Sequence, residues 1–202
     1  MTTSVRRGRP GYDLDSLLHV AVTVFNERGY DGTSMEDLAA RLGISKSAIY
    51  HHVSSKTELL QLAVDRALDA LAAVVTEPLG ETAVARLESV LRGSVRVLVA
   101  ELPFVTLLLR VRGNTDAERR AMARRRELDH LLTDVVRAAV EEGSLRPDVD
   151  PALTARLLFG TVNSLIDWYR PSRALRPDEL AEAVITLSLR GLRRTDSPDR
   201  DP

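Results

Sequence analysis

Apolar side chains recur every three or four positions along most of the chain, a spacing that places them on one face of an α-helix. The first such stripe consists of Leu14, Leu17, Leu18, Ala21, Val22 and Phe25. Gly29 is placed to end this helix. We find no segment in which apolar and polar residues alternate between turn residues, as they do in a half-buried strand. The pattern therefore predicts an all-α fold.

Two short helices are predicted directly after the first one. Thr33 with Glu36 fits a capping box, which would start a helix that Gly43 ends. Ser45 is placed to cap the next helix, over about residues 45–52. Two short helices joined by a glycine turn form a helix-turn-helix, whose second helix enters the major groove in many DNA-binding proteins. Such pairs also occur in proteins that never bind DNA, so the spacing alone leaves both interpretations open.

Longer helices are predicted for the rest of the chain. Ser55 with Glu58 fits a second capping box and opens a helix that ends near Pro78. Segment 103–111 is almost wholly apolar and is expected to be buried. The other predicted helices cover residues 81–100, 116–142, 151–171 and 177–189, with Thr115–Glu118 and Asp150 as N-terminal caps.

Composition narrows the class of protein. The chain has 202 residues, of which 44% are hydrophobic and 28% charged, with a net charge of -1. These values are typical of a globular protein and leave room for nucleic-acid binding through a few well-placed cations. The absence of cysteine excludes disulfides, thiolate zinc sites and cysteine nucleophiles.

No segment suggests export or membrane insertion. The N-terminus lacks the apolar core of a signal peptide. The most apolar stretch, residues 157–166, is about half of the ~20 residues that a membrane span requires. We therefore expect a cytoplasmic protein that does not associate with a membrane.

The predicted helix at 45–52 carries polar groups suited to DNA. Its donors and stacking groups are Lys46, Ser47, Tyr50, His51 and His52, with no acidic residue between Gly43 and Lys56. Lys46 and Lys56 are the two lysines of the chain, and each lies at a predicted helix start. A lysine there opposes the helix dipole by some tenths of a kcal/mol, which suggests an external anion such as phosphate. The alternative is an ordinary solvated helix.

The histidines of the chain do not support a metal site or a catalytic site. His51 and His52 are adjacent, so on a helix they point about 100° apart and cannot both face one metal ion. No cysteine or acidic residue of the same helix completes a site, so we predict no metal. The four histidines have no placed catalytic partners and the chain has no glycine-rich phosphate loop, so we predict neither an enzyme nor a cofactor. A helical interaction protein that does not bind DNA stays as an alternative.

From about residue 14 to residue 62 the chain resembles the TetR family of bacterial transcriptional regulators. The matching residues are Phe25, Gly29, Thr33, Leu38, Ala39, Gly43, Ser45, Ile49, Tyr50, His52, Lys56 and Leu59. The chain departs from the family pattern at Ser47, where glycine is frequent, and at Val53, where an aromatic residue is usual. The first change is expected to alter base recognition, and the second to alter packing.

The resemblance implies a homodimer that binds a pseudo-palindromic operator in double-stranded DNA. It implies that Tyr50, His52 and Lys56 contact phosphates, that Thr33 caps the second helix near the backbone, and that Lys46, Ser47 and Ala48 face bases. The full set of DNA-contacting residues that we predict is Thr33, Ser34, Ser45, Lys46, Ser47, Ala48, Tyr50, His51, His52 and Lys56.

The same resemblance implies a division into regions. Residues 13–58 would form the helix-turn-helix domain, and residues 59–195 a helical domain for ligand binding and for dimerisation through the last two long helices. Residues 196–202 would form a tail, and residues 1–12 a basic arm with Arg6, Arg7 and Arg9. The arm is either a solubilising tail or a minor-groove contact.

Two later runs are FVTLLLRVRGNTDAERR at residues 104–120 and RLLFGTVNSLIDWYRP at residues 156–171. They look like the C-terminal domains of TetR-type repressors of actinobacterial catabolic operons, especially those for phenylacetate or related acyl-CoA degradation. That likeness implies release from DNA by a CoA thioester such as phenylacetyl-CoA. Arginines beside an apolar pocket suit a ligand with an acyl group and a polyanionic nucleotide. Candidate effector-binding residues are Phe104, Leu108, Arg110, Arg112, Phe159, Asn163 and Trp168. The alternatives are core or interface roles for these residues, and a neutral hydrophobic ligand that controls an efflux or lipid gene.

Overall fold

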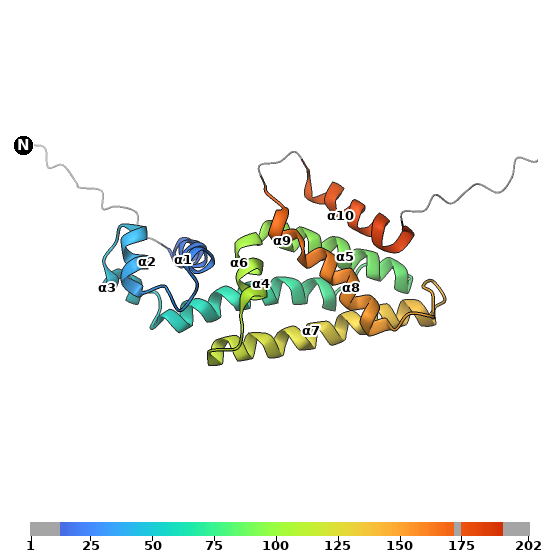
Figure 1. Ribbon diagram of the computed structural model, residues 1–202, viewed down its shortest axis with the longest axis horizontal. Helices are drawn as coiled ribbons and strands as arrows, with labels where there is room; N and C mark the ends of the chain where they lie inside the picture. Colours follow the sequence, from blue (N-terminus) through green and yellow to red (C-terminus); the bar gives the residue numbers. More distant parts are fainter. Residues whose placement is uncertain (1–12, 172–174, 192–202) are drawn as a thin grey trace, which may run out of the picture. The chain divides into compact units, whose positions relative to one another are not determined.

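A computed structural model describes residues 13–171 and 175–191 of the chain. The basic arm with Arg6, Arg7 and Arg9 and the predicted tail at 196–202 lie outside the described residues. Every regular element within them is a helix, as the periodicity predicts (Figure 1). The elements are α1 (Leu14–Arg28), α2 (Met35–Leu42), α3 (Lys46–Tyr50), α4 (Lys56–Thr76), α5 (Ala83–Ala100), α6 (Leu102–Arg110), α7 (Asp116–Glu141), α8 (Pro151–Asn163), α9 (Leu165–Trp168), α10 (Pro177–Ile185) and the π-helix η1 (Thr186–Arg190).

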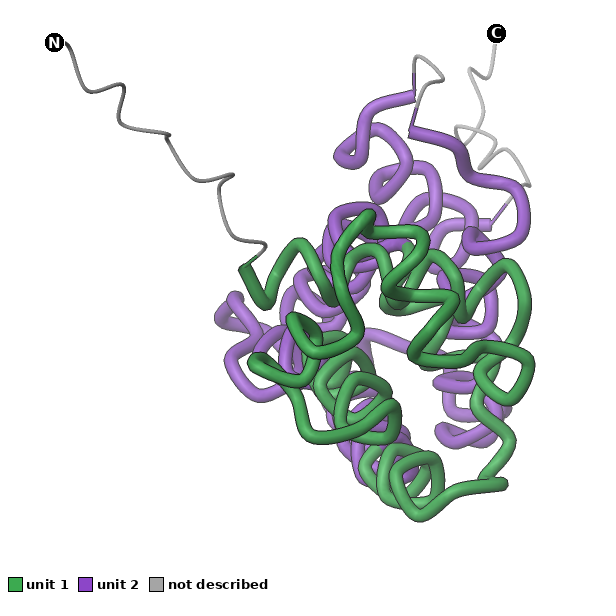
Figure 2. Tube along the Cα trace, turned by 90° about the vertical axis from the view of Figure 1, so that its left-hand side faces the viewer, with its two compact units in different colours: residues 1–68, 103–124 green, residues 69–102, 125–202 purple. Residues whose placement is uncertain are grey.

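The contacts divide the chain into two compact units (Figure 2). Unit 1 consists of residues 1–68 and 103–124, and unit 2 of residues 69–102 and 125–202. The helices α4 and α7 therefore each contribute residues to both units. Residues 103–110 of α6 belong to unit 1 with the N-terminal helices, and the predicted domain boundary at residue 58 stays a prediction. No helix among the described residues is long and apolar enough to cross a membrane.

Helix α6 is held against α1 in unit 1 by contacts at both of its ends. The side-chain amide of Asn26 donates to the carbonyl of Pro103 at 2.8 Å, and the Arg110 guanidinium donates to the carbonyl of Asn26 at 3.1 Å. Between these contacts, the fully buried Phe104 ring packs edge-on against the His19 ring at a centroid distance of 4.9 Å. The Arg66 guanidinium lies 4.3 Å from the centre of the same ring. Phe104 thus joins three helices.

The helix starts follow the predicted caps with two corrections. The Ser45 hydroxyl accepts from the Ala48 N–H, Asp150 caps α8, and Thr115 with Glu118 caps α7, as predicted. The predicted Thr33–Glu36 box is wrong. The box that starts α2 is Ser34 with Asp37, one position along.

Thr33 cannot serve as the cap because it is buried. Only 2% of the residue is exposed, and its hydroxyl donates to the Gly29 carbonyl at 2.7 Å. The second correction concerns α4, where Ser55 accepts from the Glu58 N–H as predicted, but the Glu58 carboxylate accepts from Ser54 instead of returning to Ser55. Both corrections shift a capping contact by one residue.

Unit 2 is built around α5, which packs against α8 and α10. Its buried face includes Leu87, Leu91, Val95 and Leu98. The single helix predicted over 151–171 is interrupted at Ser164, whose hydroxyl donates to the Thr161 carbonyl at 2.7 Å, and it continues as the short α9. A hydrogen bond from a serine side chain to a backbone carbonyl competes with the backbone hydrogen bonds of a helix. The helix predicted over 177–189 ends as α10 at Ile185 and is extended by η1.

The position of Phe104 gives a test of the unit 1 core. We expect Phe104→Ala to lower the free energy of unfolding by about 3–5 kcal/mol, because it removes a fully buried ring and leaves a cavity between three helices. Urea denaturation followed by circular dichroism measures this loss. Leu79→Ala is the control, since Leu79 is 77% exposed and its loss should change stability by less than about 0.5 kcal/mol. Equal effects of the two substitutions would show that Phe104 is not a core residue.

Candidate nucleic-acid interface and effector cavities

The turn between α2 and α3 fixes the direction in which α3 leaves α2. Gly43 has a φ of 67°, the left-handed conformation that glycine adopts without strain. Its N–H donates to the Ala40 carbonyl at 3.2 Å, and the Ile44 N–H donates to the Ala39 carbonyl at 3.1 Å. These bonds satisfy the last carbonyls of α2 within the turn. The two helices therefore meet at the short glycine turn that the sequence predicts.

One face of α3 is buried and the opposite face is open to solvent. Ile49 is fully buried and Val53 is 3% exposed, so both belong to the core of unit 1. Most of the predicted DNA-contacting residues of this segment lie on the open face, namely Ser45, Lys46, Ser47, Tyr50, His51 and His52. The structure brings these six side chains together on one short helix and the turn that follows it. Ala48 is half-buried between the two faces.

Hydrogen bonds orient the first turn of α3. The Ser45 hydroxyl, which caps the helix, also lies 2.9 Å from the Ser47 hydroxyl. Ser47, the departure from the family pattern, is thereby linked to the cap. The Lys46 ammonium lies 5.9 Å from the centre of the Tyr50 ring. The open face therefore combines hydroxyl, ammonium and phenol groups.

Lys46 has a carboxylate partner that was not predicted. Its ammonium donates to Glu36 in the first turn of α2. The hydrogen bond from Lys46 lowers the pKa of Glu36 below its ordinary value, and the same bond raises the pKa of Lys46. The premise that no carboxylate is available to Lys46 is therefore wrong, because the acid comes from the preceding helix and not from α3.

Lys56 is occupied by carbonyl groups of its own unit. Its ammonium donates to the carbonyls of Tyr30 and Thr33, each at 2.8 Å, and lies 4.3 Å from the centre of the Tyr30 ring. The Tyr30 hydroxyl is 3.0 Å from the Thr57 hydroxyl. Lys56 thus ties the turn before α2 to the first turn of α4. Of the other predicted contacts, Ser34 is exposed as the cap of α2, whereas the Thr33 side chain is buried.

The predicted effector residues are distributed over both units. Phe104, Leu108, Arg110 and Arg112 belong to unit 1, where the first two are buried in the core and Arg110 binds Asn26. Phe159, Asn163 and Trp168 belong to unit 2. Phe104 and Leu108 are buried among the core residues of unit 1, and their role in effector binding stays a prediction. Trp168 is 52% exposed.

Two of the predicted residues share a groove between α7 and α8 of unit 2. The groove has a volume of about 510 Å³, and Phe159 and Asn163 line its α8 side. Basic side chains from both helices also line it, namely Arg125, Arg126, His130 and Arg156. Gly160 leaves space on its wall, because a Cβ atom at that position would meet nothing within 4 Å. One carboxylate, that of Asp129, lies in the lining.

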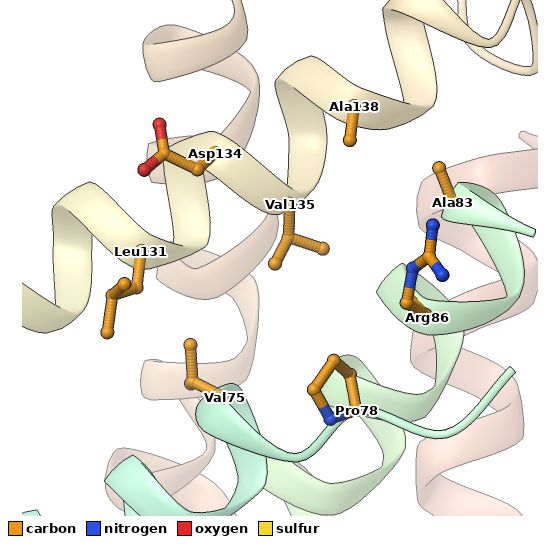
Figure 3. Close-up of a pocket in the computed structure, with 8 residues that line it drawn as sticks. All are labelled: Val75, Pro78, Ala83, Arg86, Leu131, Asp134, Val135 and Ala138. Atoms are coloured by element: carbon orange, nitrogen blue, oxygen red, sulfur yellow. The ribbon is translucent and has the colours of Figure 1, made fainter.

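A second cavity of unit 2 is more apolar. It measures about 260 Å³ and lies between the end of α4, the start of α5 and the middle of α7 (Figure 3). Its apolar lining consists of Val75, Pro78, Ala83, Leu131, Val135 and Ala138, and Arg86 and Asp134 are its two charged residues. Asp134 pairs with Arg137 on the same helix. Sequence reasoning missed this cavity, because α4 and α5 meet α7 here only through the tertiary fold.

No group of three or more histidine, cysteine, aspartate or glutamate side chains within residues 13–171 and 175–191 is arranged to hold a metal ion. His51 and His52 lie in the turn after α3. They lie on the exposed face described above.

Comparison with known proteins gives the same assignment for both halves of the chain. Residues 17–63 match the family described as bacterial regulatory proteins, tetR family. Residues 80–192 match the family described as tetracyclin repressor-like, C-terminal domain. The second match alone covers more than half of the chain.

Individual proteins of this family are similar over nearly the whole chain. A TetR regulator from Streptomyces coelicolor A3, known from its crystal structure, is 51% identical with a TM-score of 0.83, and the alignment covers 96% of each chain. The transcriptional repressor KstR2 of Rhodococcus jostii is 29% identical over 87% of this chain and 89% of its own. The regulator AibR, whose crystal structure contains isovaleryl coenzyme A and operator DNA, shares the fold with 24% identity and a TM-score of 0.73, over 87% of this chain and 97% of its own. The chain belongs to the TetR family of bacterial transcriptional regulators.

Proposed function

We propose that the protein is a dimeric repressor that reads its operator with α3 and leaves it when an acyl-CoA thioester binds unit 2. The observation that carries the DNA-reading part is the exposed polar face of α3 above the buried Ile49. A helix that enters the major groove needs such a face, with donors for phosphates and base edges. In a dimer on a pseudo-palindrome, the two α3 helices would lie one DNA turn apart, about 34–36 Å.

The exposure and the hydrogen bonds of the predicted residues support different roles for them at the operator. Lys46, Ser47, Tyr50 and His52 are exposed on or beside α3 and keep their proposed contacts. Lys56 already donates to two carbonyls, so its main role in this proposal is to position α3. Thr33 would act in the same indirect way, through its buried bond to Gly29.

The dimer interface is proposed to involve α8, α9, α10 and η1. Large apolar side chains of these helices are exposed in the single chain, namely Leu153 at 49%, Leu157 at 61%, Trp168 at 52% and Leu187 at 51%. Large apolar side chains left exposed in a single chain are typical of a protein interface when they gather in one patch, and we propose that these four do. An isologous contact between two copies would cover it in both at once.

The basic groove between α7 and α8 is proposed as the effector site. A CoA thioester carries phosphate groups, which arginine binds through charge-assisted hydrogen bonds. Arg126 and Arg156 face this groove from opposite helices, and Phe159 supplies an apolar contact. AibR binds isovaleryl coenzyme A, which supports the same ligand class for a protein of this fold. Phenylacetyl-CoA is the thioester we propose to test first.

The apolar cavity of Figure 3 favours the second candidate, a neutral hydrophobic effector. Its lining offers one arginine and one paired aspartate, too few charges for a nucleotide. A volume of about 260 Å³ suits a small molecule only. The two candidates therefore occupy different cavities and are separable by mutation.

The DNA-reading assignment is tested with the double variant Lys46→Ala, Tyr50→Ala. We expect it to lose specific binding to DNA from the neighbourhood of its own gene, and to show a log affinity against log salt that is less steep by about 0.9 for each lost phosphate contact. Fluorescence anisotropy over a salt series measures both effects. Arg41→Ala on α2 is the matched control for the loss of a cation. Unchanged operator binding by the double variant, with a normal circular dichroism spectrum, would refute the assignment.

The interface is tested with Leu157→Asp combined with Leu187→Asp. A carboxylate on each of these side chains would be desolvated in the interface, so we expect monomers and a loss of operator affinity. Analytical ultracentrifugation measures the assembly state. Leu79→Asp is the control, because Leu79 is even more exposed but lies outside these helices. A double variant that stays dimeric would place the interface elsewhere.

The effector site is tested by calorimetry with free CoA, isovaleryl-CoA and phenylacetyl-CoA. We expect Arg126→Gln with Arg156→Gln to weaken all three by at least about tenfold, since a hydrogen bond to a charged group contributes about 1.5–3 kcal/mol. Val135→Phe, which fills the apolar cavity, should leave CoA binding unchanged. Strong loss of thioester binding with Val135→Phe and none with the arginine variant would move the thioester site to the apolar cavity, and no binding of any of the three ligands to the unchanged protein would favour the neutral ligand.

A further inference from the structure

The carboxylate of Glu36 lies beside the DNA-reading face without a part in helix capping. The capping box of α2 is formed by Ser34 and Asp37, and it leaves the Glu36 side chain free to turn toward α3. There it accepts a hydrogen bond from Lys46, ten residues further along the chain. The Glu36 side chain is 65% exposed and that of Lys46 is 46% exposed, so the pair lies at the surface.

This position is unfavourable for binding to the DNA backbone. A carboxylate next to the recognition helix is repelled by phosphates, and it neutralises the cation that would otherwise bind them. The pair also contributes little to folding, because solvent and salt screen an exposed ion pair and because holding two long side chains in one geometry costs entropy. The helix dipole favours an acid in the first turn of α2, so it is the pairing of Glu36 with Lys46 of α3, and not the acid alone, that points to a role beyond stability.

At an operator the same carboxylate has a favourable alternative. The edge of cytosine in the major groove presents an amino group, from which glutamate accepts a hydrogen bond. Lys46, released from Glu36, can bind guanine or phosphate at the same time. Non-operator DNA offers mainly phosphates, since non-specific binding is electrostatic. Glu36 should therefore lower the affinity for non-operator DNA more than the affinity for a matching site.

We propose that Glu36 is a specificity residue that weakens binding to non-operator DNA more than binding to the operator. The proposal rests on α3 being the recognition helix. Glu36 acts here in two ways: it holds the Lys46 ammonium away from phosphates, and it adds a negative charge to the surface that approaches the duplex. The chain offers a matched pair for comparison in Glu27 and Arg41, which lie 3.4 Å apart and are similarly exposed.

The experiment compares Glu36→Gln with Glu27→Gln, which make the same change in net charge. Affinities are measured by fluorescence anisotropy for the operator and for an unrelated duplex of equal length over a salt series. We expect Glu36→Gln to raise the affinity for the unrelated duplex at least threefold, with a slope steeper by about 0.9 for the phosphate contact that Lys46 gains. The ratio of operator to non-operator affinity should fall, and Glu27→Gln should leave that ratio unchanged.

Three outcomes would overturn the proposal. They are an unchanged ratio in Glu36→Gln, an equal fall of the ratio in both variants, and a loss of urea stability that accounts for the changed binding. The recognition-helix assignment fails separately, when Lys46→Ala with Tyr50→Ala retains operator binding. An intact assignment with an unchanged ratio for Glu36→Gln would therefore reject the role of Glu36 alone.

Discussion

The helix α3, which we propose reads DNA, has five residues, too few to be stable without its neighbours, because isolated helices shorter than about 12–15 residues are marginal in water. Its position therefore depends on a few contacts outside it. Ile49 fixes its buried face, the Ser45 cap fixes its start, and Gly43 fixes the turn before it. The Lys56 ammonium holds the loop before α2 against the first turn of α4.

Side-chain contacts within unit 1 connect α7 to α4 and α6 to α1. The proposed effector groove lies partly on α7, and α7 begins in unit 1. There Arg120 and Arg124 of α7 bind Gln61 and Asp65 of α4, and α6 is held to α1 through Asn26 and Phe104. The start of α7 and the helix-turn-helix therefore belong to the same unit.

Local signals in the sequence predicted the helices and most of their caps, but not the choice between neighbouring residues. Thr33 and Ser34 are each followed three residues later by an acid, so both fit a capping box. The burial of Thr33, a tertiary effect, decides between them. The partners of Lys46 and Lys56 come from other segments of unit 1 and have no signal in their own surroundings. The effector residues were least predictable, since an apolar run such as 103–111 predicts burial but not whether a core or a cavity receives it.

The reciprocal coupling between effector and operator is the central requirement of a ligand-released repressor. If phenylacetyl-CoA or a related thioester weakens operator binding, operator must weaken thioester binding by the same factor, with typical couplings of about 5- to 150-fold. Calorimetric titration of the thioester into free dimer and into dimer saturated with operator measures this directly. We expect the thioester to bind the operator-saturated dimer more weakly than the free dimer. The factor should equal the one by which the thioester weakens operator binding. Equal affinities for the two forms would contradict ligand-controlled release from DNA.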